Sequence, residues 1–243
     1  MDWKTKISVH KDGDMYVRGR KLTDLVGKTS FTEALFFVLR GRMPEKTEAQ
    51  MLDAILVITI EHGINVPTAF VGRSVASTGN PLNASLAAGV LSVGDYHGGA
   101  IEQAMRLLAE NKTPKQIVKD TIKQGKKIPG YGHKIYKEKD PRAETLYKTA
   151  INLKFPTEYF DKAYEIEKEL QKETGVNLPL NIDGAIAAIL LQLGFDWRIG
   201  KAFFILGRMP GMIAHIEEEM RDEKPYRRID DKDVKYIGPE IKL

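Results

Sequence analysis

The 243-residue chain contains no cysteine, which excludes disulfide bonds, thiolate catalysis and cysteine-ligated metal sites. It also lacks a long apolar run. Its most apolar stretches, residues 84–94 and 184–194, are about half of the ~20 residues that a membrane span requires, and they are typical of buried helices. The first residues contain no apolar segment of a secretion signal. We therefore expect a cytoplasmic protein that is not associated with a membrane.

An excess of one charge is also missing. The 37 basic and 33 acidic residues alternate along most of the chain, and no basic stripe with interleaved aromatic residues is present. This balance argues against nucleic acid as a partner and favours a small anionic ligand. The 42% hydrophobic content and the length are sufficient for one large domain or two unequal lobes.

Helix signals dominate the chain after residues 7–27, which alternate in polarity and predict a short hairpin or extended segment. Ser30 and Glu33 have the spacing of a capping box, at the start of a helix that should end at Gly41. The apolar pattern of residues 47–63 predicts a helix that ends at Gly63, with His62 in its last turn. Further helices are expected over residues 70–78, 81–94, 101–110, 113–125, 143–153, 158–175, 183–194, 197–208 and 211–224.

Three of the five histidines lie where the backbone is tight or a helix ends. His97 precedes two glycines, His133 follows a glycine turn, and His62 precedes Gly63. Such glycines let a ligand approach the backbone closely, although helix capping or gap filling is an equally good explanation for any one of these histidines. Metal ligation is not expected, because no histidine pair has a metal-binding helical spacing.

Asp183 stands between an extended segment and an apolar helix. It could cap that helix, or it could be an acid or base whose pKa depends on burial and on the helix end. Arg142, Arg208 and Arg227 lie at predicted loops and helix breaks, where guanidinium groups could hold a substrate with two or three carboxylates.

Four motifs in this order, GDYHGGA (94–100), IPGYGHKIYKEKDPRA (128–143), PLNIDGAIA (179–187) and ILGRMPGMIAH (205–215), resemble the citrate synthase superfamily. Within it, the chain is most similar to citryl-CoA lyase and to the C-terminal lyase module of ATP-citrate lyase. The resemblance implies an all-α, citrate synthase-like fold with a large and a small lobe and the active site between them. It assigns residues 1–97 and 199–243 to the large lobe and residues 98–198 to the small lobe.

The resemblance also implies roles for individual residues. Asp183 would move a proton at the methyl carbon of acetyl-CoA, His133 would handle the proton on the carbonyl or alcohol oxygen, and His97 would donate a hydrogen bond to the thioester oxygen. The ATP-citrate lyase module departs from histidine at the position of His97. Substrate carboxylates would be held by His62, Arg142, Arg208 and a tail arginine of a neighbouring subunit, Arg227 or Arg228. Coenzyme A would contact Ile128, Gly130, Gly132 and Lys137.

The expected reaction is the retro-Claisen cleavage of citryl-CoA to acetyl-CoA and oxaloacetate, with a coenzyme A thioester as substrate and no tightly bound cofactor. Full citrate synthases are longer, which favours a lyase, and the resemblance then implies a place in a reductive citric acid cycle. A short citrate synthase or 2-methylcitrate synthase uses the same three residues and is the alternative. A non-catalytic protein that binds an anion or assembles a partner is a third reading. The family implies a homo-oligomer, at least a dimer, with shared active sites.

Overall fold

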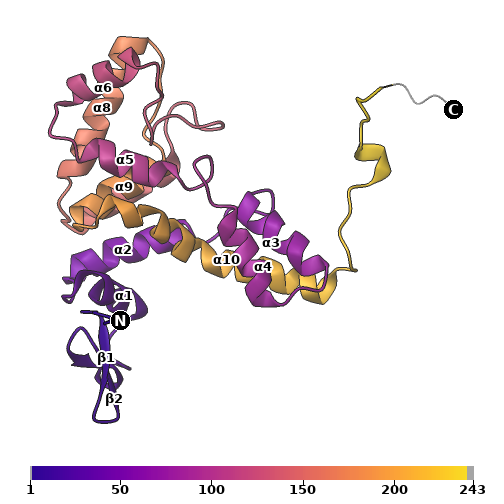
Figure 1. The fold of residues 1–243 in the computed structure, drawn as a ribbon. Coiled ribbons are helices and arrows are strands. Elements are labelled where there is room, and N and C mark those ends of the chain that lie inside the picture. Colours follow the sequence, from indigo (N-terminus) through magenta and orange to yellow (C-terminus); the bar gives the residue numbers. More distant parts are fainter. Residues whose placement is uncertain (1, 240–243) are drawn as a thin grey trace. The chain divides into compact units, whose positions relative to one another are not determined.

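The computed structural model describes residues 2–239, and helices make up most of it (Figure 1). The chain begins with a small antiparallel sheet in the order β1 (Ser8–Lys11), β2 (Asp14–Val17), β3 (Arg20–Lys21). The described residues then form ten α-helices: α1 (Phe31–Arg40), α2 (Lys46–Ile58), α3 (Pro67–Ser77), α4 (Leu82–Leu91), α5 (Ala100–Leu108), α6 (Pro114–Lys123), α7 (Pro141–Asn152), α8 (Glu158–Thr174), α9 (Ile182–Gln192) and α10 (Gly200–Asp222). The helical fold class predicted from the sequence is confirmed.

Local signals in the sequence explain where several helices begin and end. The capping box of α1 is present, because the Ser30 side chain accepts from the N–H of Glu33 and the Glu33 side chain accepts from the N–H of Ser30. The helix ends at Gly41, whose φ of +76° is in the left-handed region. Thr113 caps α6 in the same way, and Pro114 occupies its first turn.

Two helix predictions were wrong. Helix α2 ends at Ile58 rather than Gly63. The N–H of Ile60 donates to the carbonyl of Val57 three residues back (3.2 Å), and the N–H groups of His62 and Gly63 bind the Glu61 carboxylate instead of helix carbonyls. His62 therefore lies in a loop. The predicted break at residues 207–211 is also absent, since α10 runs through Pro210, which has no N–H to donate to the preceding turn.

The chain divides into two compact units, residues 1–60 with 94–207, and residues 61–93 with 208–243. In the first unit, α9 packs against α2, α5, α7 and α8. Every residue from Gly184 to Leu190 is buried, because α9 is covered on all sides. This explains why the helix is apolar around its whole circumference. The central helix therefore provides a rigid base for the segment that precedes it.

In the second unit, α3 and α4 pack closely against each other and against the C-terminal part of α10. Glycines permit the close approach, as expected for these small-residue helices: a Cβ on Gly89 would lie 2.9 Å from the carbonyl oxygen of Thr68 and 3.0 Å from the sulfur of Met212. The division between the two units falls within α10 at Gly207. The lobe boundaries expected from the sequence stay a prediction.

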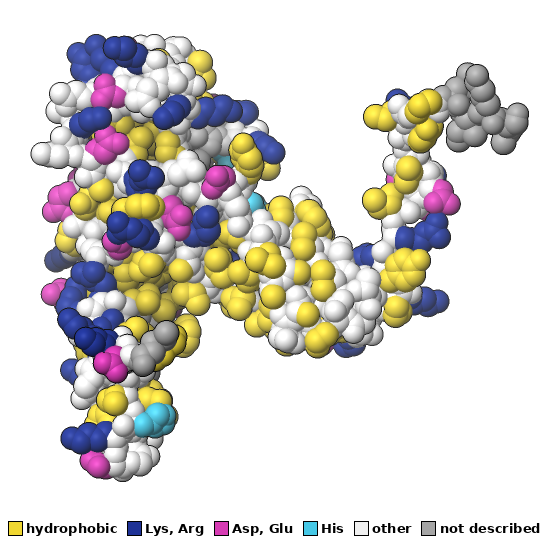
Figure 2. Space-filling model, viewed as in Figure 1, with side chains coloured by type: hydrophobic (Ala, Val, Ile, Leu, Met, Phe, Trp, Pro, Cys, Tyr) yellow, Lys and Arg dark blue, Asp and Glu magenta, His cyan; other side chains and the backbone are white. Residues whose placement is uncertain are grey.

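No helix within residues 2–239 is both long enough and apolar enough to cross a membrane. On the face of the first unit drawn in Figure 2, basic and acidic side chains are interspersed and do not gather into one basic area.

Candidate active site

His133 lies on a turn whose shape requires two glycines. Gly130 and Gly132 have φ values of +87° and +76°, in the region that favours glycine. A Cβ on Gly130 would lie 2.8 Å from the Cα of Gly184, so the turn packs directly against the start of α9. The N–H of Gly132 also donates to the carbonyl of Pro179 (2.8 Å). The turn is therefore fixed to the segment that leads into the central helix.

Hydrogen-bond donors face both ring nitrogens of His133. Its Nδ1 accepts from the N–H groups of Ile135 and Tyr136 (3.2 Å each), and a guanidinium nitrogen of Arg142 lies 3.3 Å from Nε2. The ring also stacks on Tyr136, with centroids 4.8 Å apart. Burial and the Arg142 cation lower the pKa of His133 and together outweigh the Asp140 carboxylate, which acts to raise it. The imidazole is therefore neutral at pH 7.

The fully buried carboxylate of Asp140 joins the histidine loop to helix α9. Its Oδ1 accepts from the N–H and Nε of Arg142 (3.0 Å each), and its Oδ2 accepts from Nη2 of Arg142 (2.8 Å) and from the N–H of Ile182 (3.1 Å). Burial acts to raise the pKa of Asp140, but the Arg142 guanidinium and the N–H donors outweigh it and hold the pKa below its ordinary value. Asp140 thus fixes Arg142 and the first turn of α9 at once.

Asn181, not Asp183, caps helix α9. The Asn181 side chain accepts from the N–H groups of Asp183 (3.0 Å) and Gly184 (3.2 Å), and its Nδ2 donates to the carbonyl of Gly132 (2.9 Å). Its own N–H donates to the carbonyl of Gly130 (2.9 Å). The capping role considered for Asp183 was wrong. Asp183 lies in the first turn of α9, next to Gly184, which packs against Gly130 of the turn that carries His133.

His97 lies in the loop before α5, the helix that packs along α9. Its N–H and carbonyl pair with Gly94, and its ring meets Phe204 edge-on at 5.3 Å. Gly98 has a φ of +80°, and a Cβ there would lie 2.6 Å from the Phe204 ring. The glycine after His97 is thus required by packing as well as by backbone conformation.

The residues expected to contact coenzyme A lie on the same turn and the loop after it. Lys137 is exposed, and its Nζ donates to the carbonyl of His133 (3.1 Å). Asn177 holds this loop by donating to the carbonyl of Lys137 (2.9 Å). Ile128 is 6% exposed and so packs under the turn. This arrangement leaves backbone groups and the Lys137 ammonium at the edge of the turn.

The remaining predicted residues belong to the second unit. His62 is exposed in the loop after α2, and Arg208 lies within α10, two residues before Pro210. His97, His133, Arg142 and Asp183 belong to the first unit, whereas His62, Arg208 and Arg227 belong to the second.

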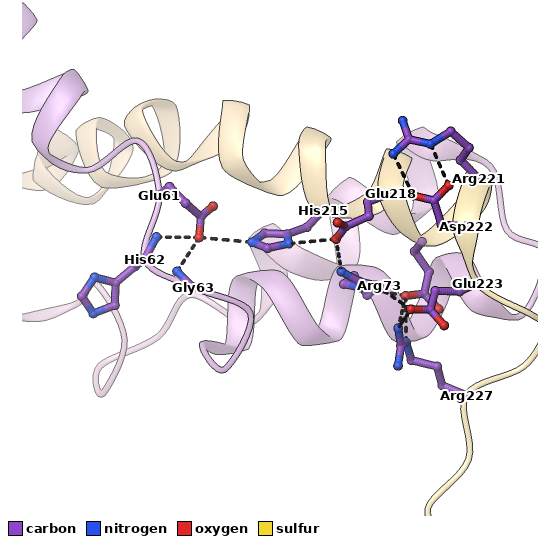
Figure 3. A network of polar contacts seen from close by, with 11 residues as sticks. Glu61, His62, Gly63, Arg73, His215, Glu218, Arg221, Asp222, Glu223 and Arg227 are labelled. Atoms are coloured by element: carbon purple, nitrogen blue, oxygen red, sulfur yellow. Dashed lines mark hydrogen bonds and ion pairs between the residues drawn. The ribbon is translucent and has the colours of Figure 1, made fainter.

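Arg227 is held by carboxylates of its own chain. Its Nε and Nη2 each lie 2.7 Å from Oε2 of Glu219, and Nη2 lies 3.1 Å from Glu223 (Figure 3). Arg228 is more exposed and pairs with Asp231 (2.9 Å) within the tail. The two tail arginines considered from the sequence are thus anchored in different ways.

A pocket of about 550 Å³ lies between α7 and α8, and none of the predicted site residues lines it. Its walls include Asp140, Tyr147, Tyr164 and Glu167. Burial raises the pKa of Tyr164 in this wall to about 12. Because no predicted site residue lines the pocket, we place the candidate site at the histidine turn instead. Among the described residues, no cluster of three or more His, Asp or Glu side chains could hold a metal ion.

Asp140 and Asn181 were quoted within motifs but received no role from the sequence. Both stand immediately before a helix, where Asp and Asn are favoured caps, and this signal could have identified them as caps. It could not have shown that both also bind segments more than 40 residues away, at separations of 42 and 49 residues.

Known proteins are similar to this chain over most of its length. Residues 39–229 match the family model described as citrate synthase, C-terminal domain. The solved structure of citryl-CoA lyase from Hydrogenobacter thermophilus is 47% identical, with a TM-score of 0.95 over 99% of this chain and 97% of that one. ATP citrate lyase from Methanothrix soehngenii, in complex with citrate and coenzyme A, is 26% identical, with a TM-score of 0.87 over 99% of this chain and 42% of that one.

Among curated proteins, the citrate/2-methylcitrate synthase of Bacillus subtilis is 32% identical over 219 residues, which are 86% of this chain and 57% of that protein. The chain spans about half the length of such curated relatives. The family model nevertheless covers most of the chain and includes the histidine turn, the DPR segment and the start of α9. The chain therefore belongs to the citrate synthase family.

Proposed function

We propose that the protein is a citryl-CoA lyase that cleaves citryl-CoA to acetyl-CoA and oxaloacetate. The observation that carries the proposal is a hydrogen-bonded junction in the first unit. Asp140 binds Arg142, which lies beside the neutral His133, and also binds the N–H of Ile182. Asn181 joins the histidine turn to the first turn of α9, where Asp183 lies. The likeness of nearly the whole chain to a citryl-CoA lyase supports this choice of reaction within the family.

The cleavage needs one base, one acid and stabilisation of an enolate. His133 takes the proton of the tertiary hydroxyl of citryl-CoA, and the oxygen lone pair forms the carbonyl of oxaloacetate. The bond between the carbinol carbon and the methylene carbon breaks, and its electron pair becomes the enolate of acetyl-CoA. Asp183, in its protonated form, then donates a proton to the methylene carbon to give the methyl group. His97 stabilises the enolate by donating a hydrogen bond to the thioester oxygen.

The neutral state of His133 suits the role of a base. Burial and Arg142 lower its pKa, so the ring has a lone pair available at pH 7. The neutral ring has a single lone pair, on the nitrogen that carries no proton. In the absence of substrate, a guanidinium nitrogen of Arg142 lies 3.3 Å from Nε2.

Arg142 is also the best-anchored candidate for a carboxylate contact. Asp140 fixes its Nε and one terminal nitrogen, which leaves the other terminal nitrogen for a ligand. We assign His62, Arg208 and Arg227 to the remaining substrate carboxylates, and the turn from Ile128 to Gly132 with Lys137 to coenzyme A. Positioning by these groups accounts for much of the rate, because each acid or base contributes about 10² to 10⁴-fold.

A single-turnover experiment with purified protein and citryl-CoA tests the proposal. Acetyl-CoA and oxaloacetate as nearly sole products are expected. Citrate with free coenzyme A would instead identify a short citrate synthase, and no reaction beyond the no-enzyme control would favour a non-catalytic protein. Asp183→Asn should abolish turnover but leave coenzyme A binding intact, and unchanged turnover would remove Asp183 from the mechanism.

We propose that the protein acts as a homo-oligomer, at least a dimer. Apolar side chains that a partner could cover are exposed on the second unit (Figure 2), among them Leu91 (84%) and Ile229 (73%). Light scattering during size-exclusion chromatography should give at least twice the chain mass of 27.3 kDa.

A further inference from the structure

A network of polar contacts in the second unit begins at the loop that carries His62 (Figure 3). Glu61 binds His215 of α10, and His215 also lies 4.0 Å from Glu218 on the next turn of that helix. Arg73 of α3 lies 2.5 Å from Glu218 and thereby links the network to the rest of the unit. The His62 loop is therefore connected to two helices through charged side chains.

One oxygen of Glu61 fixes the backbone around His62. Oε1 accepts from the N–H of His62 (2.7 Å) and from the N–H of Gly63. Burial acts to raise the pKa of Glu61, but the hydrogen bonds from these N–H groups and from His215 outweigh it and lower the pKa. The carboxylate is therefore ionised at pH 7, and it holds two consecutive N–H groups after α2 has ended.

His215 fixes that carboxylate in turn. Its Nε2 lies 3.2 Å from the same Oε1, across 154 residues of sequence. The ring is mostly buried, with a side-chain exposure of 19%, and it sits on the long helix α10. A helix-borne side chain has few alternative rotamers, so it restricts Glu61 more than water would.

We propose that Glu61 and His215 are positioning residues that hold the His62 loop in its ligand-binding shape. This proposal rests on the proposed function, in which His62 binds a substrate carboxylate. Neither side chain needs to touch the substrate. Their effect reaches His62 through the backbone, so it should change how tightly the substrate is bound and leave the chemical step largely unchanged.

Steady-state kinetics with citryl-CoA tests the assignment in three variants. Glu61→Ala removes the acceptor and should raise KM about tenfold while kcat changes less than about threefold. Glu61→Gln keeps an acceptor oxygen and should have a smaller effect. His215→Gln should raise KM in the wild-type background but not in the Glu61→Ala background, because its effect passes through Glu61. Glu217→Gln is the matched control, since Glu217 is exposed on α10 and pairs only with Arg221 among the described residues.

A second measurement does not depend on turnover. The chain has five histidines, so the ring-proton NMR signal of His62 can be assigned with a His62→Gln variant. This signal should shift in Glu61→Ala and in His215→Gln and stay in place in Glu217→Gln. If the wild type cleaves citryl-CoA but KM and the His62 signal are unchanged in Glu61→Ala, the positioning role is overturned. If the wild type is inactive but the His62 signal shifts as expected, the positioning role stands and the proposed function has failed.

Discussion

Replacement of Asp140 by asparagine should weaken both the fold and the candidate site. Oδ1 would keep its two bonds to Arg142, but the amide nitrogen would replace Oδ2 and would face Nη2 of Arg142 and the N–H of Ile182, which are donors. The variant loses two bonds to a charged carboxylate, from Nη2 of Arg142 and from the N–H of Ile182, each worth about 1.5–3 kcal/mol. Because the part-buried N–H of Ile182 is also left without an acceptor, we expect a loss of at least about 3 kcal/mol.

Urea denaturation followed by circular dichroism measures this loss, with both proteins at the same concentration in case the chain is oligomeric. Asp233→Asn is the control, since Asp233 is an exposed acidic residue whose side chain has no hydrogen bond or ion pair among the described residues, and it should change stability by less than about 0.5 kcal/mol. Activity of Asp140→Asn should also fall, because Arg142 and the first turn of α9 lose a shared anchor. Equal stability of the two variants would refute the idea that the Asp140 junction holds the loop and the helix together.

Three further predictions concern the same junction. Asn181→Ala removes the cap of α9 and the bond to the carbonyl of Gly132, and it should cost at least about 1 kcal/mol in urea denaturation. Asn181→Asp keeps a capping oxygen but sets its second oxygen against that carbonyl, so it should also lose stability; an unchanged Asn181→Asp would contradict the role of the Gly132 bond. Gly130→Ala should cost more than Gly125→Ala, because both positions have positive φ but only the first brings a Cβ within 2.8 Å of Gly184; equal losses of stability would contradict this. The pKa of His133 is lowered, so the base is lost only when the pH falls through a value below 6.5; an acid limb of kcat/KM above that value would contradict the assignment.

Much of the secondary structure could be predicted from the sequence because its signals are local. The capping box at Ser30 and Glu33, and Gly41 at the end of α1, lie within the helix or next to it, and the structure confirms them. Two local signals misled. The apolar pattern beyond Ile58 suggested more helix than forms, and Pro210 suggested a break that does not occur.

The motifs also identified the residue types of the candidate site, since His133, Arg142 and Asp183 were named from their settings and from the family resemblance. Their arrangement could not be predicted in the same way. Asp183 was considered as the cap of α9, a role that Asn181 fills, and Asp140 and Glu61 were given no role although each holds a backbone segment beside a candidate residue.

The sequence by itself determined that the chain is helical, where most helices begin, and which residues are candidates for the chemistry. Only the tertiary structure decided that Asp140 bonds to Ile182 and Asn181 to Gly132, and that His215 bonds to Glu61. The physical reason is the range of the interactions. Helix caps and apolar periodicity act over about four residues, whereas these hydrogen bonds join residues 42, 49 and 154 positions apart and exist only once the helices have packed.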